Sequence, residues 1–187
     1  VKSGQFQRDL RTVYIEGEGG SGKSLLADKL GSLWSNDLGI HYTSTSGRGT
    51  TYDFAGNYAG EWVTISNEIS SKELPVRQFL SLYDPHRVAV VNSRNYDKLW
   101  FSRYAIITNS ESINEWVTNL VYYSGRQYQD GMIHGQLKRN KDTNSVLCQV
   151  RRRIPYVVQF DTTNDALKCI NVYKINDAYN AYIYIGN

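Results

Sequence analysis

Residues 17–24 read Gly-Glu-Gly-Gly-Ser-Gly-Lys-Ser, and this stretch fits the pattern G-x-x-x-x-G-K-[ST] at every fixed position. The apolar residues 13–15 before it predict a strand, and residues 24–30 after it predict a helix. In such a strand–loop–helix setting, glycines let backbone N–H groups turn towards phosphate oxygens, and the helix N-terminus adds its positive dipole end. The stretch therefore predicts a phosphate-binding loop; the alternative is a glycine-rich turn that precedes a helix by chance.

The loop predicts a set of nucleotide-binding residues, namely Gly17, Gly19, Gly20, Ser21, Gly22, Lys23 and Ser24. In loops of this pattern the lysine reaches the β- and γ-phosphates, and the hydroxyl that follows it ligates Mg²⁺. We therefore expect ATP and Mg²⁺ as cofactors.

The bulk composition is that of a globular domain. The chain has 187 residues, of which 41% are hydrophobic and 21% charged, enough for one domain with its own core. A net charge of +3 permits nucleic-acid binding without arguing for it. The distant Cys148 and Cys169 suggest no disulfide framework, and no apolar run is long enough to cross a membrane.

Short apolar strands alternate with helical patterns along the chain. The expected strands are residues 13–16, 41–45, 63–65, 87–91, 104–108 and 156–160, with a terminal hairpin over 170–185. The expected helices follow the loop, cover residues 76–83, and begin at a capping box, Ser-Ile-Asn-Glu, at 112–115. The polar stretch 125–144, with Lys138, Arg139 and Lys141, is expected to be a loop. This alternation predicts an α/β fold with a mainly parallel sheet.

A strand with a polar end supplies the second half of the expected site. Residues 63–68 read Val-Thr-Ile-Ser-Asn-Glu, an apolar run that ends in Asn67 and Glu68. Hydrolysis of ATP needs an acidic group near Mg²⁺ or the attacking water, and parallel strands bring their carboxyl ends together. Glu68 is the candidate for this group; the alternative is an ordinary polar turn after a strand.

The motifs, in this order, resemble the superfamily 3 helicase domain of replication initiator (Rep) proteins from rolling-circle plasmids and small circular single-stranded DNA viruses. The resemblance runs from about residue 11 to residue 160. Besides the loop, it rests on Arg-Thr-Val-Tyr-Ile at 11–15, Tyr-Ala-Gly-Glu-Trp-Val at 58–63, Arg-Asn-Tyr-Asp-Lys at 94–98, Ile-Ile-Thr-Asn-Ser at 106–110 with Trp116, and Arg-Arg-Ile at 152–154. It implies a P-loop NTPase fold of AAA+ type, with the ATPase domain over residues 1–160 and a β-rich extension over 161–187 packed on it.

The resemblance implies four catalytic residues, which are Lys23, Glu68, Asn109 and Arg152. Glu68 polarises the attacking water in this scheme, and a polar side chain after the strand 104–108 senses the γ-phosphate. The family order there is Ser-Asn, whereas this chain reads Asn109-Ser110. Spacing from Trp116 favours Ser110 as the sensor, but side-chain chemistry favours Asn109, which we choose.

Two further roles follow from the resemblance. Arg152, or else Arg153, is expected to reach the ATP of a neighbouring subunit as an arginine finger, the alternative being a solvated basic cluster. Arg94 and Lys98 are expected to grip the DNA backbone, the alternative being ordinary hairpin charges.

The implied Mg²⁺ ligands are Ser24, Asn67 and Glu68. The family usually has Asp at the position of Asn67. Because Asn keeps an oxygen but loses the negative charge, we expect Mg²⁺ to be held less firmly and hydrolysis to be weakened.

The resulting expectation is an ATP-dependent DNA helicase or translocase that works on single-stranded DNA as a homo-oligomeric ring, hexameric by resemblance. The family's initiators also carry a nicking domain with a His-hydrophobic-His motif, and no His-x-His occurs here. We therefore expect the helicase domain of a longer initiator, in a bacterial cytoplasm or in a host nucleus if the source is a eukaryotic virus. The alternatives are an ATP-binding assembly module with little hydrolysis, a small-molecule phosphotransferase, and an RNA helicase of a small virus.

Overall fold

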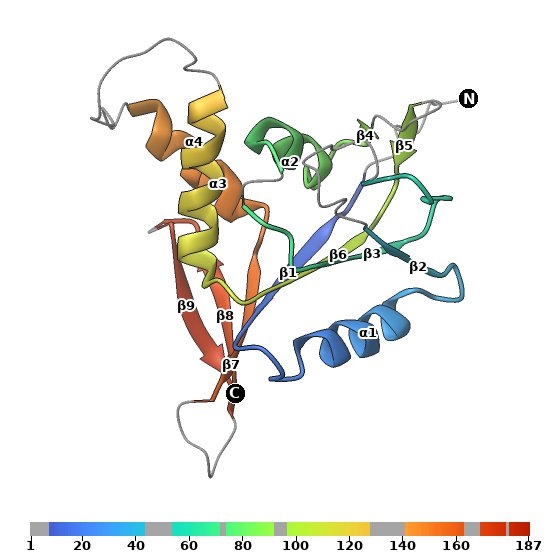
Figure 1. Cartoon of the computed structure of the whole chain (residues 1–187), viewed down its shortest axis with the longest axis horizontal. Coiled ribbons are helices and arrows are strands. Elements are labelled where there is room, and N and C mark those ends of the chain that lie inside the picture. Colours follow the sequence, from blue (N-terminus) through green and yellow to red (C-terminus); the bar gives the residue numbers. More distant parts are fainter. Residues whose placement is uncertain are drawn as a thin grey trace.

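A seven-stranded sheet forms the centre of the molecule (Figure 1). A computed structural model of the chain describes residues 8–43, 54–71, 74–91, 97–127, 141–162, 169–178 and 180–187. In the order in which they pair, the strands are β2 (Ile40–Tyr42), β3 (Val63–Asn67), β6 (Tyr104–Asn109), β1 (Arg11–Glu16), β7 (Tyr156–Asp161), β8 (Cys169–Asn176) and β9 (Ala181–Gly186). The first five run parallel, and β8 and β9 add antiparallel pairs at one edge. The expected mainly parallel α/β sheet is thus confirmed.

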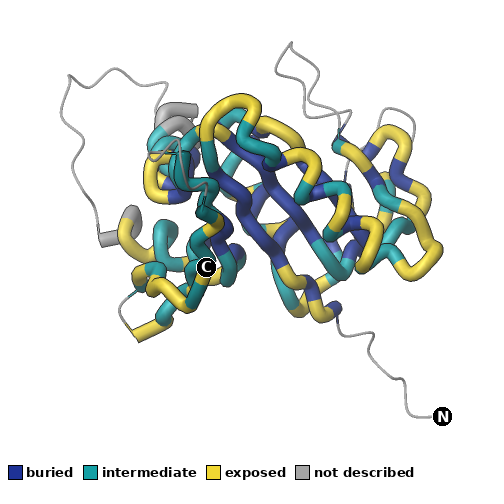
Figure 2. Tube along the Cα trace, turned by 90° about the horizontal axis from the view of Figure 1, so that it is seen from below, coloured by how far each residue is buried: buried dark blue, intermediate teal, exposed yellow. Residues whose placement is uncertain are grey.

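Helices cover both faces of this sheet (Figure 1). Helix α1 (Lys23–Trp34) lies on one face, and α2 (Val76–Leu82), α3 (Ile113–Gln127) and α4 (Lys141–Arg152) lie on the other. Since strand side chains alternate between faces, Val13 and Ile15 of β1 join the core under α1, while Tyr14 joins the larger core under the other helices. Burial on both faces explains why residues 13–15 of β1 are apolar in succession instead of alternating with polar residues. Figure 2 shows the central strands as the buried centre of the trace.

Two expectations about the elements need correction. Residues 89–91 do form a strand, β4 (Ala89–Val91), but it pairs antiparallel with β5 (Lys98–Trp100) in a separate two-stranded sheet. The stretch expected as a loop contains the start of α4 at Lys141, while Lys138 and Arg139 lie outside the described residues. Helix α4 escaped prediction because its apolar residues, at 146, 147 and 150, fall only in its second half.

The start of α3 follows its sequence signature. Ser112 Oγ accepts a hydrogen bond from the Glu115 amide (3.4 Å), and the Glu115 carboxylate accepts one from the Ser112 amide (3.3 Å). This reciprocal pair is the capping box that the sequence predicts, and it fixes the N-terminus of α3 at the carboxyl end of β6. None of the helices within the described ranges has the length and hydropathy that a membrane span requires.

Two arginines hold the C-terminal end of α2 against the sheet. The buried Arg8 donates to the carbonyl of Leu82 (2.7 Å) and to that of Ser102 (2.8 Å), and Arg153 donates to the carbonyl of Leu80 (2.9 Å). The last carbonyls of a helix lack intrahelical partners and carry partial negative charge, so cationic donors suit them. Burial lowers the pKa of Arg8 to about 10, which leaves the guanidinium charged at neutral pH.

We predict that Arg8→Met lowers the free energy of unfolding by about 2–4 kcal/mol, because the carbonyls of Leu82 and Ser102 stay buried without their charged donor. Urea unfolding followed by circular dichroism measures this change. The matched control is Arg11→Met, since Arg11 is exposed and forms an ion pair with exposed Asp9; it should shift the value by less than about 0.5 kcal/mol. Equal effects of the two substitutions would contradict the anchoring role of Arg8.

Candidate nucleotide-binding site

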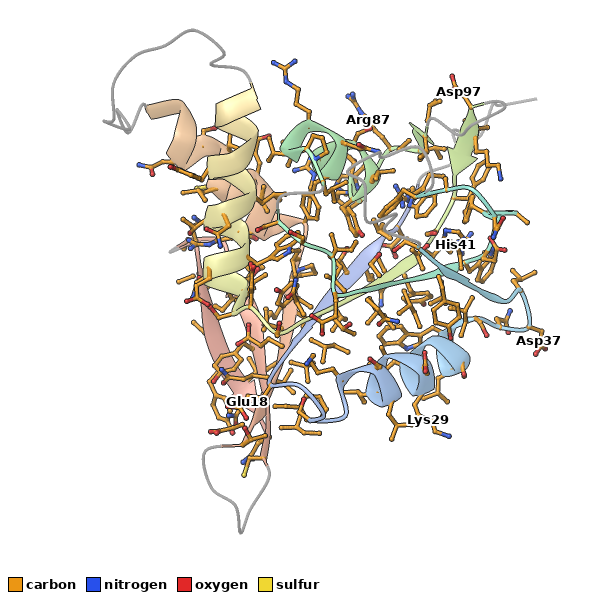
Figure 3. The ribbon with its side chains drawn as sticks, viewed as in Figure 1. Glu18, Lys29, Asp37, His41, Arg87 and Asp97 are labelled. Carbon is orange, nitrogen blue, oxygen red and sulfur yellow. The ribbon has the colours of Figure 1, made fainter. Side chains whose placement is uncertain are left out.

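The site is built where parallel strands end. The register pairs Glu16 of β1 with Asn109 of β6, and Thr108 of β6 with Asn67 of β3, so these three strands finish at the same level. The phosphate-binding loop joins β1 to α1 at this carboxyl edge (Figure 1), and Figure 3 labels Glu18 within it. Ligands of open α/β sheets bind at this edge.

Lys23 lies at the first turn of α1 with its side chain almost wholly buried. Its ammonium group donates to the carbonyls of Gly17 and Glu18, both at 2.8 Å, and lies 3.6 Å from Glu68 Oε1. Glu68 follows β3, two strands away from β1 in the sheet. The fold thus brings together the loop lysine and the acidic residue that the sequence assigned to one site.

The conformation of the loop depends on its glycines. Gly20 and Gly22 have φ angles of +78° and +103°, in the left-handed region that glycine adopts without strain. Gly22 caps the N-terminus of α1 without a side-chain hydrogen bond, which leaves the first amides of the helix to other acceptors. The hydroxyl of Ser21 is buried and finds no partner among the described residues. A loop with free amides and an unpaired hydroxyl fits an anionic ligand such as a nucleotide phosphate.

Glu68 is held in an uncommon backbone conformation. Its φ angle is +50°, and its amide donates to the carbonyl of Thr108 (2.9 Å). A non-glycine residue in this region carries strain that the surrounding structure must offset, and such residues gather at functional sites. The carboxylate is exposed at the carboxyl edge, where an attacking water could reach it.

The two candidates for the sensor behave differently. Asn109 is buried, and its amide group donates to the carbonyl of Ile69 (2.8 Å) and accepts from the amide of Glu111 (3.1 Å). Ser110 is exposed, and its amide and hydroxyl lie 3.3 and 3.4 Å from Glu68 Oε2. In this conformation Ser110 contacts the acidic residue, whereas Asn109 ties two backbone segments together. Our choice of Asn109 over Ser110 rested on side-chain chemistry, which does not reveal these partners.

The expected Mg²⁺ ligands lie around the same edge. Ser24 follows Lys23 in α1 and is exposed, while Asn67 and Glu68 end β3. Asn67 Oδ1 already accepts a hydrogen bond from the Thr108 hydroxyl (3.0 Å), so only part of its acceptor capacity is free. One carboxylate, one hydroxyl and one amide oxygen fit a Mg²⁺ ion that is held mainly by phosphates and waters.

Glu16 is a residue of the site that the sequence analysis did not single out. Its buried carboxylate accepts from the amide of Ile113 (2.6 Å), at the N-terminus of α3, and from Gln159 Nε2 of β7 (3.1 Å). Burial raises the pKa of Glu16, and these two hydrogen bonds oppose the rise. The sequence did contain a signal for Glu16, because it is an acidic residue at the end of an apolar strand, directly before the loop. Glu16 links the first residue of the loop to the helix that follows β6.

The family described as RNA helicase matches residues 13–112, which is more than half of the chain. This chain belongs to that RNA helicase family. A replication protein of Onion yellows phytoplasma (strain OY-M) is 28% identical over 113 residues, which make up 60% of this chain and 28% of that protein. The chain therefore spans little more than a quarter of this relative. Together the two matches confirm the resemblance to the superfamily 3 helicase domain of a replication initiator.

One solved structure bears on the fold. The VirB11 ATPase of the Brucella suis type IV secretion system, solved in complex with sulphate, superposes with a TM-score of 0.53 at 12% identity. The match covers 88% of this chain and 48% of that one. At this level of identity it supports the P-loop NTPase fold alone, which agrees with the sheet described above.

The three consecutive arginines of this helicase domain have separate environments. Arg151 donates to the carbonyl of Asn180 (3.0 Å), in the turn between β8 and β9, and to Asn114 of α3 (3.2 Å). Arg153 is largely buried at the end of α2 and also donates to Asp84 (3.3 Å). Burial alone would raise the pKa of Asp84, but hydrogen bonds from the amides of residues 86 and 87 and the Arg153 charge lower it. Arg151 and Arg153 are thus engaged in holding the fold.

Arg152 differs from both neighbours. Its side chain is 61% exposed and makes an ion pair with exposed Asp177 (3.4 Å). Because it precedes β7, which runs parallel to β1, it lies at the amino edge of the sheet. The phosphate-binding loop lies at the opposite edge, roughly 15 Å away along the strands. Arg152 therefore does not reach the loop of its own chain.

The expected DNA-contacting residues of the helicase are only partly described. Lys98 starts β5 and donates to the carbonyls of Gly56 (2.7 Å) and Tyr58 (3.0 Å), so its ammonium group fastens a neighbouring turn in this conformation. Arg94 lies outside the described residues.

We predict that Asn109→Ala lowers the free energy of unfolding by about 1–3 kcal/mol, since it removes one buried and one partly buried hydrogen bond. Ser110→Ala, at the exposed neighbouring position, should change it by less than about 0.5 kcal/mol. Urea unfolding of both variants tests the assignment. An Asn109→Ala variant as stable as the wild type would contradict this structural role of Asn109; its role as sensor stays a prediction.

Proposed function

We propose that this chain is the ATP-driven motor domain of a replication protein and that it moves single-stranded DNA through a ring of identical subunits. The observation that carries the proposal is the 3.6 Å approach of Lys23 Nζ to Glu68 Oε1 at the carboxyl edge of the sheet. A cation that binds the terminal phosphates and a carboxylate that orients water must border the same space for phosphoryl transfer to water, and this contact shows that the two side chains do so. The family membership supports the same reading.

Each residue has a defined task in this proposal. Lys23 leaves the carbonyls of Gly17 and Glu18 and donates to the terminal phosphate oxygens, which offer stronger, charged acceptors. Glu68, freed from Lys23, accepts a hydrogen bond from the attacking water and orients it. Ser110 keeps the carboxylate in place through its amide and hydroxyl. Ser24 and Asn67 would help to hold a Mg²⁺ ion, which would supply charge compensation on the phosphates.

The position of Arg152 supports assembly into a ring. An exposed arginine at the amino edge can add a positive charge only to the nucleotide of another subunit. The amino edge of one subunit would then face the carboxyl edge of the next, and such head-to-tail contacts can close into a ring. By resemblance we propose six subunits.

The nucleic-acid partner belongs to the same proposal. Arg94 and Lys98 would contact the strand through its phosphates, and such contacts do not depend on base sequence. The RNA helicase description of the family favours an RNA strand as the second candidate. Stimulation of ATP hydrolysis by single-stranded DNA but not by RNA of the same sequence would support the first; the reverse would support the second.

Because the chain spans only part of its relative, we propose that it works within a longer initiator that carries a nicking domain. We place that protein in a bacterial cytoplasm, or in a host nucleus if the source is a eukaryotic virus.

A mixing experiment tests the shared active site. We expect ATP hydrolysis in the presence of single-stranded DNA to be abolished by either of two substitutions. Lys23→Ala removes the phosphate-binding lysine, and Arg152→Ala removes the arginine finger. In an equal mixture, about a quarter of the interfaces combine an intact loop with an intact finger, so about a quarter of the wild-type rate should return. Steady-state phosphate release at increasing protein concentration measures this.

The control for this mixture is Arg11→Ala, which removes another exposed, ion-paired arginine and should leave the rate unchanged. No recovery on mixing, although the wild type is active, would refute the role of Arg152 across subunits. If the wild type binds ATP but hydrolyses it no faster than Lys23→Ala, the motor proposal fails and an assembly module takes its place.

Asn67 favours that second candidate function, an ATP-binding module with slow turnover. We predict that Asn67→Asp raises the hydrolysis rate about fivefold at limiting Mg²⁺, because one added charge attracts the ion by about 1 kcal/mol at a partly exposed site. The rate should be measured over a Mg²⁺ titration. Asn57→Asp adds the same charge at an exposed position away from the loop and should have no effect; an unchanged or lower rate for Asn67→Asp would refute the weakened-site reading.

A further inference from the structure

The positions of Lys23 and Glu68 define a direction for a bound nucleotide. Glu68 follows β3, and Ser110 follows β6, so the groups proposed to act on the γ-phosphate lie on the β3 and β6 side of the loop. The α-phosphate and the sugar must then continue away from these strands. On the opposite side of β1 the sheet continues with β7 and β8. The base of the nucleotide is therefore directed towards the carboxyl end of β7 and the adjoining start of β8.

An aromatic side chain lies at that place. Phe160, near the end of β7, packs directly under both ends of the loop. A Cβ atom on Gly17 would lie 2.8 Å from Phe160 Cβ, and one on Gly22 would lie 3.7 Å from Phe160 Cε1. The Phe160 side chain is nevertheless only half-buried. Part of it therefore remains open beside the loop.

The apolar surface extends from Phe160 onto the next strand. The antiparallel register pairs Phe160 with Ile170 and Val158 with Val172, so these four side chains point to the same face of the sheet. Helix α1 packs on that face over β1, β3 and β6 and ends short of β8 (Figure 1). Ile170 is accordingly 40% exposed.

We propose that Phe160 and Ile170 form the platform on which the base of the bound nucleotide stacks. The inference rests on the proposed nucleotide binding and adds the position and chemistry of the base site. A purine has a flat apolar face, and stacking on an aromatic ring and an aliphatic neighbour needs no particular pattern of donors and acceptors. The described side chains of this platform carry no hydrogen-bonding group. Adenine and guanine nucleotides should therefore bind with similar affinity, and pyrimidine nucleotides more weakly.

The decisive comparison is between ATP and inorganic tripolyphosphate, which shares the phosphates but lacks the base. Dissociation constants for both, in Mg²⁺ buffer, can be measured by isothermal titration calorimetry. Phe160→Leu keeps apolar bulk under the loop but removes the ring, and Ile170→Ser removes the neighbour without touching the loop. Each should weaken ATP binding, about tenfold for Phe160→Leu, and leave tripolyphosphate binding within about twofold.

The control is Ile183→Ser, at another exposed apolar position on β9, which should alter neither constant. If both variants weaken ATP and tripolyphosphate equally, Phe160 only supports the loop and the base site is refuted. The base site is also refuted if neither dissociation constant changes. That result is expected if a second subunit covers this face of the sheet instead. A wild-type protein that binds neither ligand would overturn the proposed function itself, whereas tripolyphosphate binding as tight as ATP binding would overturn the base site alone.

Discussion

The pairing of β1 between β6 and β7 is the constraint on which the rest of the structure depends. Its register sends Tyr14 into one core and its neighbours Val13 and Ile15 into the other, so a slip by one residue would exchange the two cores. The same register sets the level at which Glu16 ends the strand and the phosphate-binding loop begins. Packing thus fixes the site: the loop, Glu68 and Ser110 meet because three buried parallel strands finish together.

The charged groups of the site find partners within the chain. Lys23 satisfies two loop carbonyls and faces Glu68, while Glu16 accepts hydrogen bonds from the start of α3 and from β7. A buried lysine without such partners would lose its proton or destabilise the fold. A nucleotide must therefore exchange acceptors for Lys23, and the exchange releases Glu68. In the proposed mechanism, nucleotide binding and the positioning of the Glu68 carboxylate are therefore one event.

The sequence predicted what depends on neighbours in the chain. The glycine pattern, the apolar strand before it and the Ser112–Glu115 capping box each specify local structure, and all three are confirmed. The long-range contacts of Arg8, Glu16 and Asn109 could not be predicted, because these partners lie between 40 residues (Asn109 to Ile69) and 143 residues (Glu16 to Gln159) away. In the same way, only the fold separates Arg152 from the two arginines beside it.

The polarity of a parallel sheet explains why, in the proposed mechanism, one chain is an incomplete catalyst. Everything that follows a strand gathers at the carboxyl edge, and everything that precedes one gathers at the amino edge. The loop, Glu68 and the platform at Phe160 follow β1, β3 and β7, whereas Arg152 precedes β7 and is kept apart by the length of the strand. No rotation of an arginine side chain spans that distance. A nucleotide held at one edge can acquire the positive charge of the other only from a second subunit, so the proposed role of Arg152 would couple catalysis to assembly through the topology of the sheet.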